Sequence, residues 1–239
     1  MKTIEELEKI YNDKANKRRQ INLQFAVMGV EFEDIDNAYI DEGVIIGEGT
    51  FIGQGVKISG MTRIGKNCEI IQNSRIADCT VGDDTTIEQS VITSSSIGDC
   101  TTVGPFAYIR PGSKIANHVK IGDFVEIKNS TIMDHTKIAH LSYVGDADLG
   151  ENINIGCGVV FVNFDGKEKH RSTVRKNAFI GCNVNIISPV TIEEKAYVAA
   201  GTTVTKSVPK GSLCVSRGKS TILEGWVDRR GLLSKHIGD

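Results

Sequence analysis

The hydrophobic residues of this chain recur at a spacing of six. From Val44 to Val204 an aliphatic residue, often followed by glycine, stands at or near every sixth position. The positions are Ile46, Ile52, Ile58, Ile64, Ile70, Ile76, Val81, Ile87, Ile92, Ile97, Val103, Ile109, Ile115, Ile121, Ile127, Ile132, Ile138, Val144, Leu149, Ile155, Ile180, Ile186, Ile192, Val198 and Val204. This period fits neither a helix nor an alternating strand. It predicts an all-β fold, a parallel β-helix of hexapeptide repeats, in which each short strand buries its aliphatic residue only by stacking on the next coil.

The same pattern divides the chain into three parts. Residues 1–29 lack the repeat, and Thr3 with Glu6 forms a capping box ahead of an amphipathic stretch, so we expect a helix that covers the open edge of the first coil. Residues 30–204 hold the β-helix, in about nine coils of three repeats. Residues 205–239 form a polar tail. The polar residues 162–173 interrupt the repeat, and such excursions commonly carry binding groups.

Composition excludes several classes of partner. The net charge of −2 provides no basic footprint for nucleic acid or an anionic membrane surface. No apolar run is long enough to span a membrane, and the N-terminus is charged rather than signal-like. The six cysteines form no Cys-x-x-Cys pair, so we expect reduced thiols with packing rather than catalytic roles, in a cytoplasmic protein.

The regular repeat allows neighbours on adjacent coils to be calculated. Residues 18 apart should stack between Ile109 and Ile127, which places Arg110 over Lys128 and Tyr108 over Glu126. Two stacked cations repel each other, and a bound anion such as phosphate would relieve that repulsion. A solvated cationic ridge is the alternative interpretation.

The next coils add groups that could perform chemistry. One coil later Tyr143 falls under Glu126, while His140 and Asn154 fall on the neighbouring face. A pair of cations that could bind phosphate, beside a carboxylate and an imidazole, is typical of an active site. His118, His135 and His140 also faintly resemble the metal ligands of hexapeptide carbonic anhydrases, but that hypothesis leaves the stacked cations unexplained, so we expect no metal.

A longer set of motifs resembles one family. These are Gly104-Pro105-Phe106-Ala107-Tyr108-Ile109-Arg110-Pro111-Gly112, Glu126-Ile127-Lys128, His140-Leu141-Ser142-Tyr143-Val144-Gly145-Asp146, Asn152-Ile153-Asn154-Ile155-Gly156, Asn163-Phe164-Asp165-Gly166, Ala199-Ala200-Gly201-Thr202-Thr203-Val204-Thr205, Ser216-Arg217 and Glu224-Gly225-Trp226. Together they resemble the acetyltransferase half of the bifunctional enzyme that makes UDP-N-acetylglucosamine. The resemblance covers roughly residues 8–226, without the uridyltransferase half.

The resemblance implies a left-handed coil, a homotrimer, and acetyl transfer from acetyl-CoA to the amine of glucosamine 1-phosphate. It implies that His140 is the general base and that Glu126 supports it. The implied sugar-phosphate ligands are Arg110, Lys128, Tyr143, Asn154 and Lys169. The implied acetyl-CoA ligands are Cys157, Asn163, Phe164, Cys182, Ala200 and Arg217.

Two departures from the family lie on the coenzyme side: Phe164 replaces the usual Tyr, and Cys182 replaces the usual Ser. An amine is nucleophilic enough to attack a thioester directly, so no covalent enzyme intermediate is needed. We also expect the excursion to carry Lys169 to the site of a neighbouring subunit. Acetylation of another amino sugar, or a trimeric scaffold without activity, remain alternatives.

Overall fold

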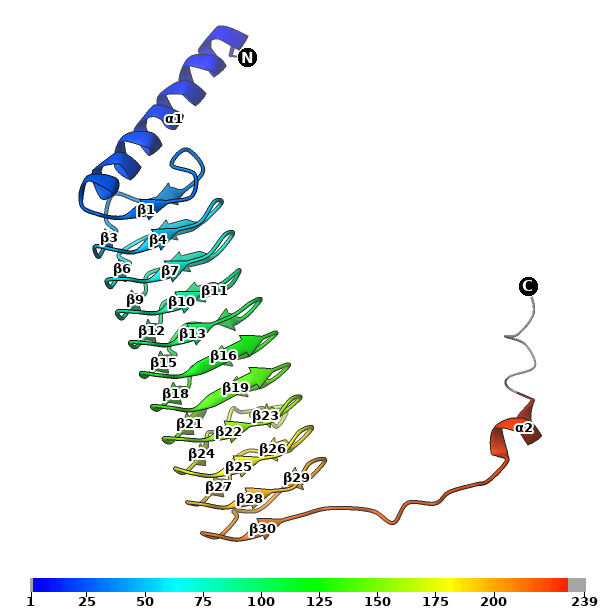
Figure 1. Ribbon diagram of the computed structural model, residues 1–239. Helices are drawn as coiled ribbons and strands as arrows, with labels where there is room; N and C mark the ends of the chain where they lie inside the picture. The colour runs from blue at the N-terminus through cyan, green and yellow to red at the C-terminus, as the bar shows by residue number, and fades with distance from the viewer. Residues whose placement is uncertain (1, 232–239) are drawn as a thin grey trace.

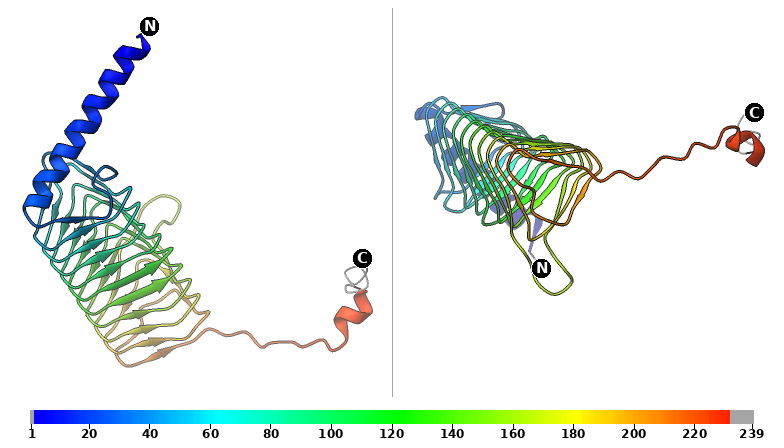
Figure 2. Two further views of the ribbon diagram at one scale, coloured as in Figure 1. Left: turned by 45° about the horizontal axis from the view of Figure 1, so that its top comes forward. Right: turned by 90° about the horizontal axis from the view of Figure 1, so that it is seen from below.

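The computed structural model describes residues 2–231 and forms one long solenoid of parallel strands (Figure 1). Three sheets of 11, 10 and 9 strands make up its sides, and every named strand pair is parallel. The predicted hexapeptide β-helix is therefore confirmed. Seen along its axis, the solenoid has a triangular outline (Figure 2).

Successive strands occupy the three sheets in turn. Sheet I contains β1 (Glu31–Phe32), β4 (Phe51–Ile52), β7 (Glu69–Ile70), β10 (Thr86–Ile87), β13 (Thr102–Val103), β16 (Lys120–Asp123), β19 (Lys137–His140), β22 (Asn154–Ile155), β25 (Phe179–Ile180), β28 (Tyr197–Val198) and β30 (Leu213–Cys214). Sheet II contains β2 (Tyr39–Ile40), β5 (Lys57–Ser59), β8 (Arg75–Ala77), β11 (Val91–Thr93), β14 (Tyr108–Ile109), β17 (Glu126–Lys128), β20 (Tyr143–Gly145), β23 (Val160–Val162), β26 (Asn185–Ile187) and β29 (Thr203–Val204). Sheet III contains β3 (Ile45–Ile46), β6 (Arg63–Ile64), β9 (Thr80–Val81), β12 (Ser96–Ile97), β15 (Lys114–Ile115), β18 (Thr131–Ile132), β21 (Ala147–Leu149), β24 (Ser172–Val174) and β27 (Thr191–Ile192).

The repeated aliphatic residues fill the interior. Each is buried and pairs with its equivalent on the next coil, as Ile109 does with Ile127 and Ile127 with Val144. A second buried layer consists of small residues two positions before the aliphatic ones. The hydroxyl of Thr50, for example, donates to the Gly65 carbonyl and accepts from the Cys68 N–H. These bonds satisfy corner backbone groups that a purely apolar core would leave unpaired.

The corners of the solenoid use left-handed backbone conformations. Three positions before each aliphatic residue the chain commonly has a positive φ, between 41° and 60° at the non-glycine positions. Asn and Asp occupy many of these positions, because their short polar side chains tolerate this conformation. Phe106, Phe124 and Leu141 also adopt it, and all three are exposed at the corner between sheets I and II. The rings of Phe106 and Phe124 stack with centroids 5.5 Å apart.

Helix α1 (Ile4–Val27) begins with the predicted capping box, in which Thr3 and Glu6 bond each other's backbone N–H. The expectation that the helix covers the first coil is only partly correct. Asn22 and Phe25 are its buried residues, and the Asn22 amide donates to the carbonyls of Ile35 and Ala38. The first turns project beyond the solenoid (Figure 1), because nothing in the first coil reaches that far along the helix axis.

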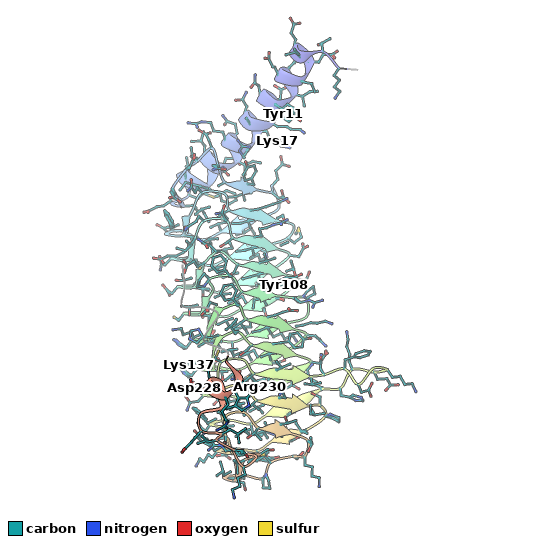
Figure 3. The ribbon with its side chains drawn as sticks, turned by 90° about the vertical axis from the view of Figure 1, so that its right-hand side faces the viewer. Tyr11, Lys17, Tyr108, Lys137, Asp228 and Arg230 are labelled. Carbon is teal, nitrogen blue, oxygen red and sulfur yellow. The ribbon has the colours of Figure 1, made fainter. Side chains whose placement is uncertain are left out.

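The two other departures from the repeat lie towards the C-terminal end. The excursion leaves the solenoid as a hairpin between β23 and β24 (Figures 2 and 3). Beyond β29, residues expected to form only a polar tail pair once more with the solenoid as β30. The chain then extends away to the short helix α2 (Trp226–Arg230) (Figure 1). Within residues 2–231, no helix is long and apolar enough to cross a membrane.

Candidate functional site

The predicted cation column lies on the outer side of sheet II. The register pairs Tyr108 with Glu126 and Ile109 with Ile127, so Arg110 lies beside Lys128. Glu126 in turn pairs with Tyr143, and Lys128 pairs with Gly145. Arg110, Glu126, Lys128 and Tyr143 are all half-buried. The neighbours calculated from the repeat therefore agree with the structure.

A third cation joins the column from the excursion. Contact with Lys169, followed by desolvation and the charges of Lys169 and Arg110, lowers the pKa of the Lys128 ammonium. Lys169 was expected at the site of a neighbouring subunit, but here it lies against Lys128 of its own chain. Three positive charges therefore converge without a second subunit. Such a cluster is suited to a multiply charged oxyanion.

Stacked cations alone do not distinguish this column. Lys57 pairs with Arg75 on sheet II, and Lys120 pairs with Lys137 on sheet I. Like-charge neighbours are therefore tolerated elsewhere on the exposed faces of this solenoid, where water screens them. The convergence of three cations with a carboxylate and a phenol is what distinguishes the column of Arg110.

Arg110 is held by its neighbours. Its Nη1 lies 2.7 Å from Oε1 of Glu126, and its guanidinium lies over the ring of Tyr108, 5.8 Å from the centroid. The hydrogen bond that Arg110 donates to Glu126 raises the pKa of the Arg110 guanidinium. Glu126 therefore holds the guanidinium of Arg110 in place.

The imidazole of His140 has a different carboxylate partner. Its Nδ1 lies 2.5 Å from Oδ1 of Asp123, which ends β16 and pairs in register with His140 at the end of β19. The hydrogen bond with His140 lowers the pKa of the Asp123 carboxyl. In this structure the carboxylate bonded to His140 is that of Asp123, whereas the carboxylate of Glu126 is bonded to Arg110. The reason is geometric: Asp123 lies on the same sheet as His140, whereas Glu126 lies around the corner.

The predicted coenzyme residues continue the column of His140. The register pairs Ile138 with Ile155, Ile155 with Ile180, and Ile180 with Val198. Two positions after these residues, His140, Cys157, Cys182 and Ala200 therefore follow one another along the solenoid. Cys157 is half-buried, whereas Cys182 and Ala200 are exposed.

Cys182 was expected to be a packing residue, and its exposure contradicts that interpretation. Cys68 and Cys79 are the buried thiols, and burial raises the pKa of both. The same exposure leaves Cys182 accessible to a molecule lying along the column.

A polar network lies beside Tyr143 and Gly145 on sheet II. The Asn163 amide donates to Oδ2 of Asp146 at 2.5 Å and lies 3.4 Å from the hydroxyl of Tyr143. Asp146 also accepts from the Asn129 amide at 2.6 Å, and both Asp146 and Asn163 are buried. Tyr143 passes over Gly145, where an added Cβ would lie 2.3 Å from the phenolic oxygen. Gly145 therefore provides the space that the Tyr143 side chain occupies.

The excursion is fixed at its base. Arg171 forms a forked ion pair with Asp148, with its Nε 2.7 Å from Oδ2 and its Nη2 2.5 Å from Oδ1. At the tip, Asp165 accepts from the N–H groups of Lys167 and Glu168 and from the ring of His170. These contacts strongly lower the pKa of the Asp165 carboxyl. The hairpin that carries Lys169 and Phe164 is therefore ordered by its own polar groups.

The remaining predicted residues lie further from this centre. Asn154 pairs with Lys137 on sheet I, one coil beyond the strand that carries His140. Phe164 is exposed on the excursion, and Arg217 is exposed on the segment after β30. His118 and His135, considered as metal ligands, stack with ring centroids 4.9 Å apart. Across residues 2–231 no three His, Cys, Asp or Glu side chains come together as a metal site.

Asp123, Asp146 and Gly145 were not identified from the sequence. Asp123 could have been found, because it stands two positions after Ile121 just as His140 stands two positions after Ile138. Asp146 occupies a left-handed corner position, where Asp is common for conformational reasons, so the sequence offered no signal for it.

Comparison with known proteins supports the predicted resemblance. Residues 94–129 match the family described as bacterial transferase hexapeptide (six repeats). The bifunctional protein GlmU of Clostridium acetobutylicum is 57% identical over 121 residues, which are 51% of this chain and 26% of that protein. GlmU of Acetivibrio thermocellus is 59% identical over 122 residues, again 51% and 26%. The chain thus matches about a quarter of the length of these relatives. The solved structure of the Arabidopsis UDP-N-acetylglucosamine acyltransferase aligns with a TM-score of 0.39 at 16% identity, over 73% of this chain and 68% of that one.

Proposed function

We propose that this protein transfers the acetyl group of acetyl-CoA to the amine of glucosamine 1-phosphate, as a step towards UDP-N-acetylglucosamine. One observation carries the proposal. The three cations Arg110, Lys128 and Lys169 converge on one side of a corner, and the imidazole of His140 lies on the other side. An anion-binding cluster and a proton acceptor are the two groups that a phosphorylated amine requires.

The cation column forms the acceptor site in this proposal. Arg110 offers a planar fork and the two lysines offer point charges, a combination suited to a phosphate dianion. Tyr143 and Asn154 supply further polar contacts to the sugar, with Asn163 setting the position of the Tyr143 hydroxyl.

The column that follows His140 forms the donor site. Acetyl-CoA would lie along Cys157, Cys182 and Ala200, with its thioester at His140 and with Asn163, Phe164 and Arg217 as further contacts. The continuous register of this column supports that placement. The similarity to bifunctional GlmU proteins over half of the chain supports the same assignment.

The chemistry follows from the amine. Its nitrogen attacks the thioester carbonyl while His140 takes its proton, and an imidazole has a basicity suited to that task near neutral pH. The new N–C bond forms, the C–S bond breaks, and the coenzyme A thiolate takes up the proton that His140 accepted and leaves as a thiol. In this proposal a backbone N–H near Cys157 stabilises the oxyanion of the tetrahedral intermediate.

The proposed assembly is a cytoplasmic homotrimer with the donor site shared between subunits. Two features of the single chain support a shared site. The segment that follows β30 and contains Arg217 leaves the solenoid and extends away from it towards α2 (Figure 1). The apolar side chains of Ile222, Leu223 and Trp226 on this segment are exposed.

A thiol-release assay tests the function. Acetyl-CoA is supplied with glucosamine 1-phosphate, glucosamine 6-phosphate, glucosamine or galactosamine 1-phosphate, and free coenzyme A is measured. We expect release with glucosamine 1-phosphate and little with unphosphorylated glucosamine. His140→Ala should lower kcat by about 10²–10⁴-fold while acetyl-CoA binding persists. If coenzyme A is released only with another amino sugar, that sugar is the acceptor instead of glucosamine 1-phosphate. If folded protein releases none with any acceptor, the result favours a trimeric scaffold without activity.

A further inference from the structure

Two carboxylates lie near the proposed base, and their contacts differ. Glu126 is bonded to Arg110, with 2.7 Å between Oε1 and Nη1. Asp123 is bonded to His140, with 2.5 Å between Oδ1 and Nδ1. Each carboxylate thus has a defined partner, and the imidazole is paired with the one that the family resemblance does not identify.

The backbone fixes the pairing of Asp123 with His140. Strands β16 and β19 each contain four residues, whereas the other strands contain two or three. The additional pairing extends beyond the buried aliphatic residues and sets Asp123 directly against His140. The N–H of Leu141 donates to the Asp123 carbonyl at 3.0 Å. At Gly122 an added Cβ would lie 1.9 Å from the Ala139 carbonyl oxygen, so the two strands run in very close contact here.

We propose that Asp123 is the positioning residue for His140, holding its proton on Nδ1 and leaving Nε2 free to accept the proton of the amine. This inference rests on the proposed acetyl transfer. The carboxylate of Asp123 can only accept, so a neutral imidazole bonded to it must donate from Nδ1. Nε2, on the opposite side of the ring, then has a lone pair available.

Asp123 also supplies charge. The hydrogen bond with His140 lowers the pKa of the Asp123 carboxyl, so the group is ionised at neutral pH. A fixed negative charge stabilises the imidazolium that forms when Nε2 takes the proton, as an acidic residue does behind the histidine of a hydrolase triad. Glu126 has a separate task, because it holds the guanidinium of Arg110 in the acceptor site.

The tautomer of His140 provides a direct test that needs no activity. Full-length protein labelled with ¹⁵N in its histidines is observed by long-range ¹⁵N NMR at neutral pH, and the His140 signals are assigned with His140→Gln. We expect the Nδ1–H form in the unaltered protein and in Glu126→Gln. In Asp123→Ala the imidazole should move towards the Nε2–H form, which neutral histidine prefers in water.

Kinetics separate the two carboxylates. Asp123→Ala should lower kcat by roughly 10- to 100-fold, less than a buried triad carboxylate contributes, with KM for glucosamine 1-phosphate nearly unchanged. Asp123→Asn keeps an acceptor oxygen but loses the charge. It should therefore retain the Nδ1–H form, with a kcat between those of the unaltered protein and Asp123→Ala. Glu126→Gln should instead raise the KM for the phosphorylated acceptor.

The proposal is overturned if Asp123→Ala, with an unchanged melting temperature, keeps both the tautomer and kcat. It is equally overturned if Glu126→Gln, rather than a change at Asp123, shifts the tautomer. Should Asp123→Ala fail to fold, the isosteric Asp123→Asn decides through its kcat, which an unimportant charge would leave unchanged. If the unaltered protein acetylates no acceptor, the proposed function fails, and the NMR result still shows whether Asp123 sets the tautomer.

Discussion

Gly145→Ala tests whether the Tyr143 side chain is part of the acceptor site. The new methyl carbon would lie 2.3 Å from the Tyr143 phenolic oxygen, 2.5 Å from its Cζ and 2.8 Å from the Asn163 amide nitrogen. Ordinary contact begins near 3.4 Å, so the phenolic oxygen must move by about 3.4 − 2.3 = 1.1 Å. The closest clash is with the end of the half-buried Tyr143 side chain, which can swing outward without moving the backbone, while the buried Asn163 amide must shift by about 3.4 − 2.8 = 0.6 Å.

We therefore expect a small loss of stability, at or below the lower end of the roughly 1–3 kcal/mol typical of overpacking. The acceptor site should suffer more, because displacing a binding group by about 1 Å can reduce catalytic efficiency by up to ~10²-fold. Initial rates with varied glucosamine 1-phosphate should show a KM raised by about 10-fold or more, with acetyl-CoA KM unchanged. Thermal melting provides the control for folding.

A double-mutant cycle sharpens this test. If Gly145→Ala acts by displacing Tyr143, the effects should not add, and Gly145→Ala with Tyr143→Ala should match Tyr143→Ala alone. Gly122→Ala offers a contrast, because its Cβ would lie 1.9 Å from a backbone oxygen that cannot swing away, and it should greatly lower the melting temperature. A folded Gly145→Ala protein with normal acceptor KM would refute the role of Tyr143.

Two further predictions concern charge. Lys128→Ala should raise the KM for glucosamine 1-phosphate by roughly 10- to 100-fold while leaving the melting temperature unchanged or slightly higher, because it removes a like-charge contact with Lys169 and Arg110; a lower melting temperature with unchanged KM would contradict this. Asp148→Asn should loosen the hairpin, seen as faster trypsin cleavage after Lys167 or Lys169. The hydrogen bond with Arg171 lowers the folded-state pKa of Asp148, so its contribution is present above about pH 4 and is lost as pH falls through that lowered pKa. Hydrogen exchange in the hairpin that does not increase below pH 4, after correction for intrinsic rates, would exclude that contribution.

The fold and the neighbouring pairs could be predicted because a solenoid repeats one local rule. Backbone hydrogen bonds between coils fix which residues stack, so the spacing of Ile109, Ile127 and Val144 alone places Glu126 over Tyr143. The same arithmetic, 140 − 123 = 17, brings Asp123 beside His140 once the shortened coil between Ile121 and Ile138 is noticed.

Side-chain partnerships were harder to predict, because they depend on direction as well as position. Glu126 and Asp123 stand three residues apart, yet a corner lies between them and turns one towards Arg110 and the other towards His140. The path of the excursion could not be predicted from the repeat either, because the Arg171–Asp148 ion pair that holds its base joins residues 23 positions apart. Both features can be recognised only in the folded structure.

The N-terminal helix shows how the sequence and the structure together yield a last prediction. Its capping box correctly indicated where it begins, but amphipathicity did not reveal how much of it packs. Contacts with the solenoid involve its C-terminal half: Lys17 pairs with Glu42 at 2.8 Å, Arg18 lies over Tyr39, and the Asn22 amide bonds two carbonyls.

Asn22→Ala would leave two carbonyls without a donor, at a cost of about 1–3 kcal/mol. Deleting residues 2–14 removes none of these contacts, so it should leave the melting temperature of the solenoid nearly unchanged, while Asn22→Ala lowers it. If the deletion destabilises the protein as much as Asn22→Ala does, the projecting turns must contribute to stability, and a second copy of the chain would have to contact them.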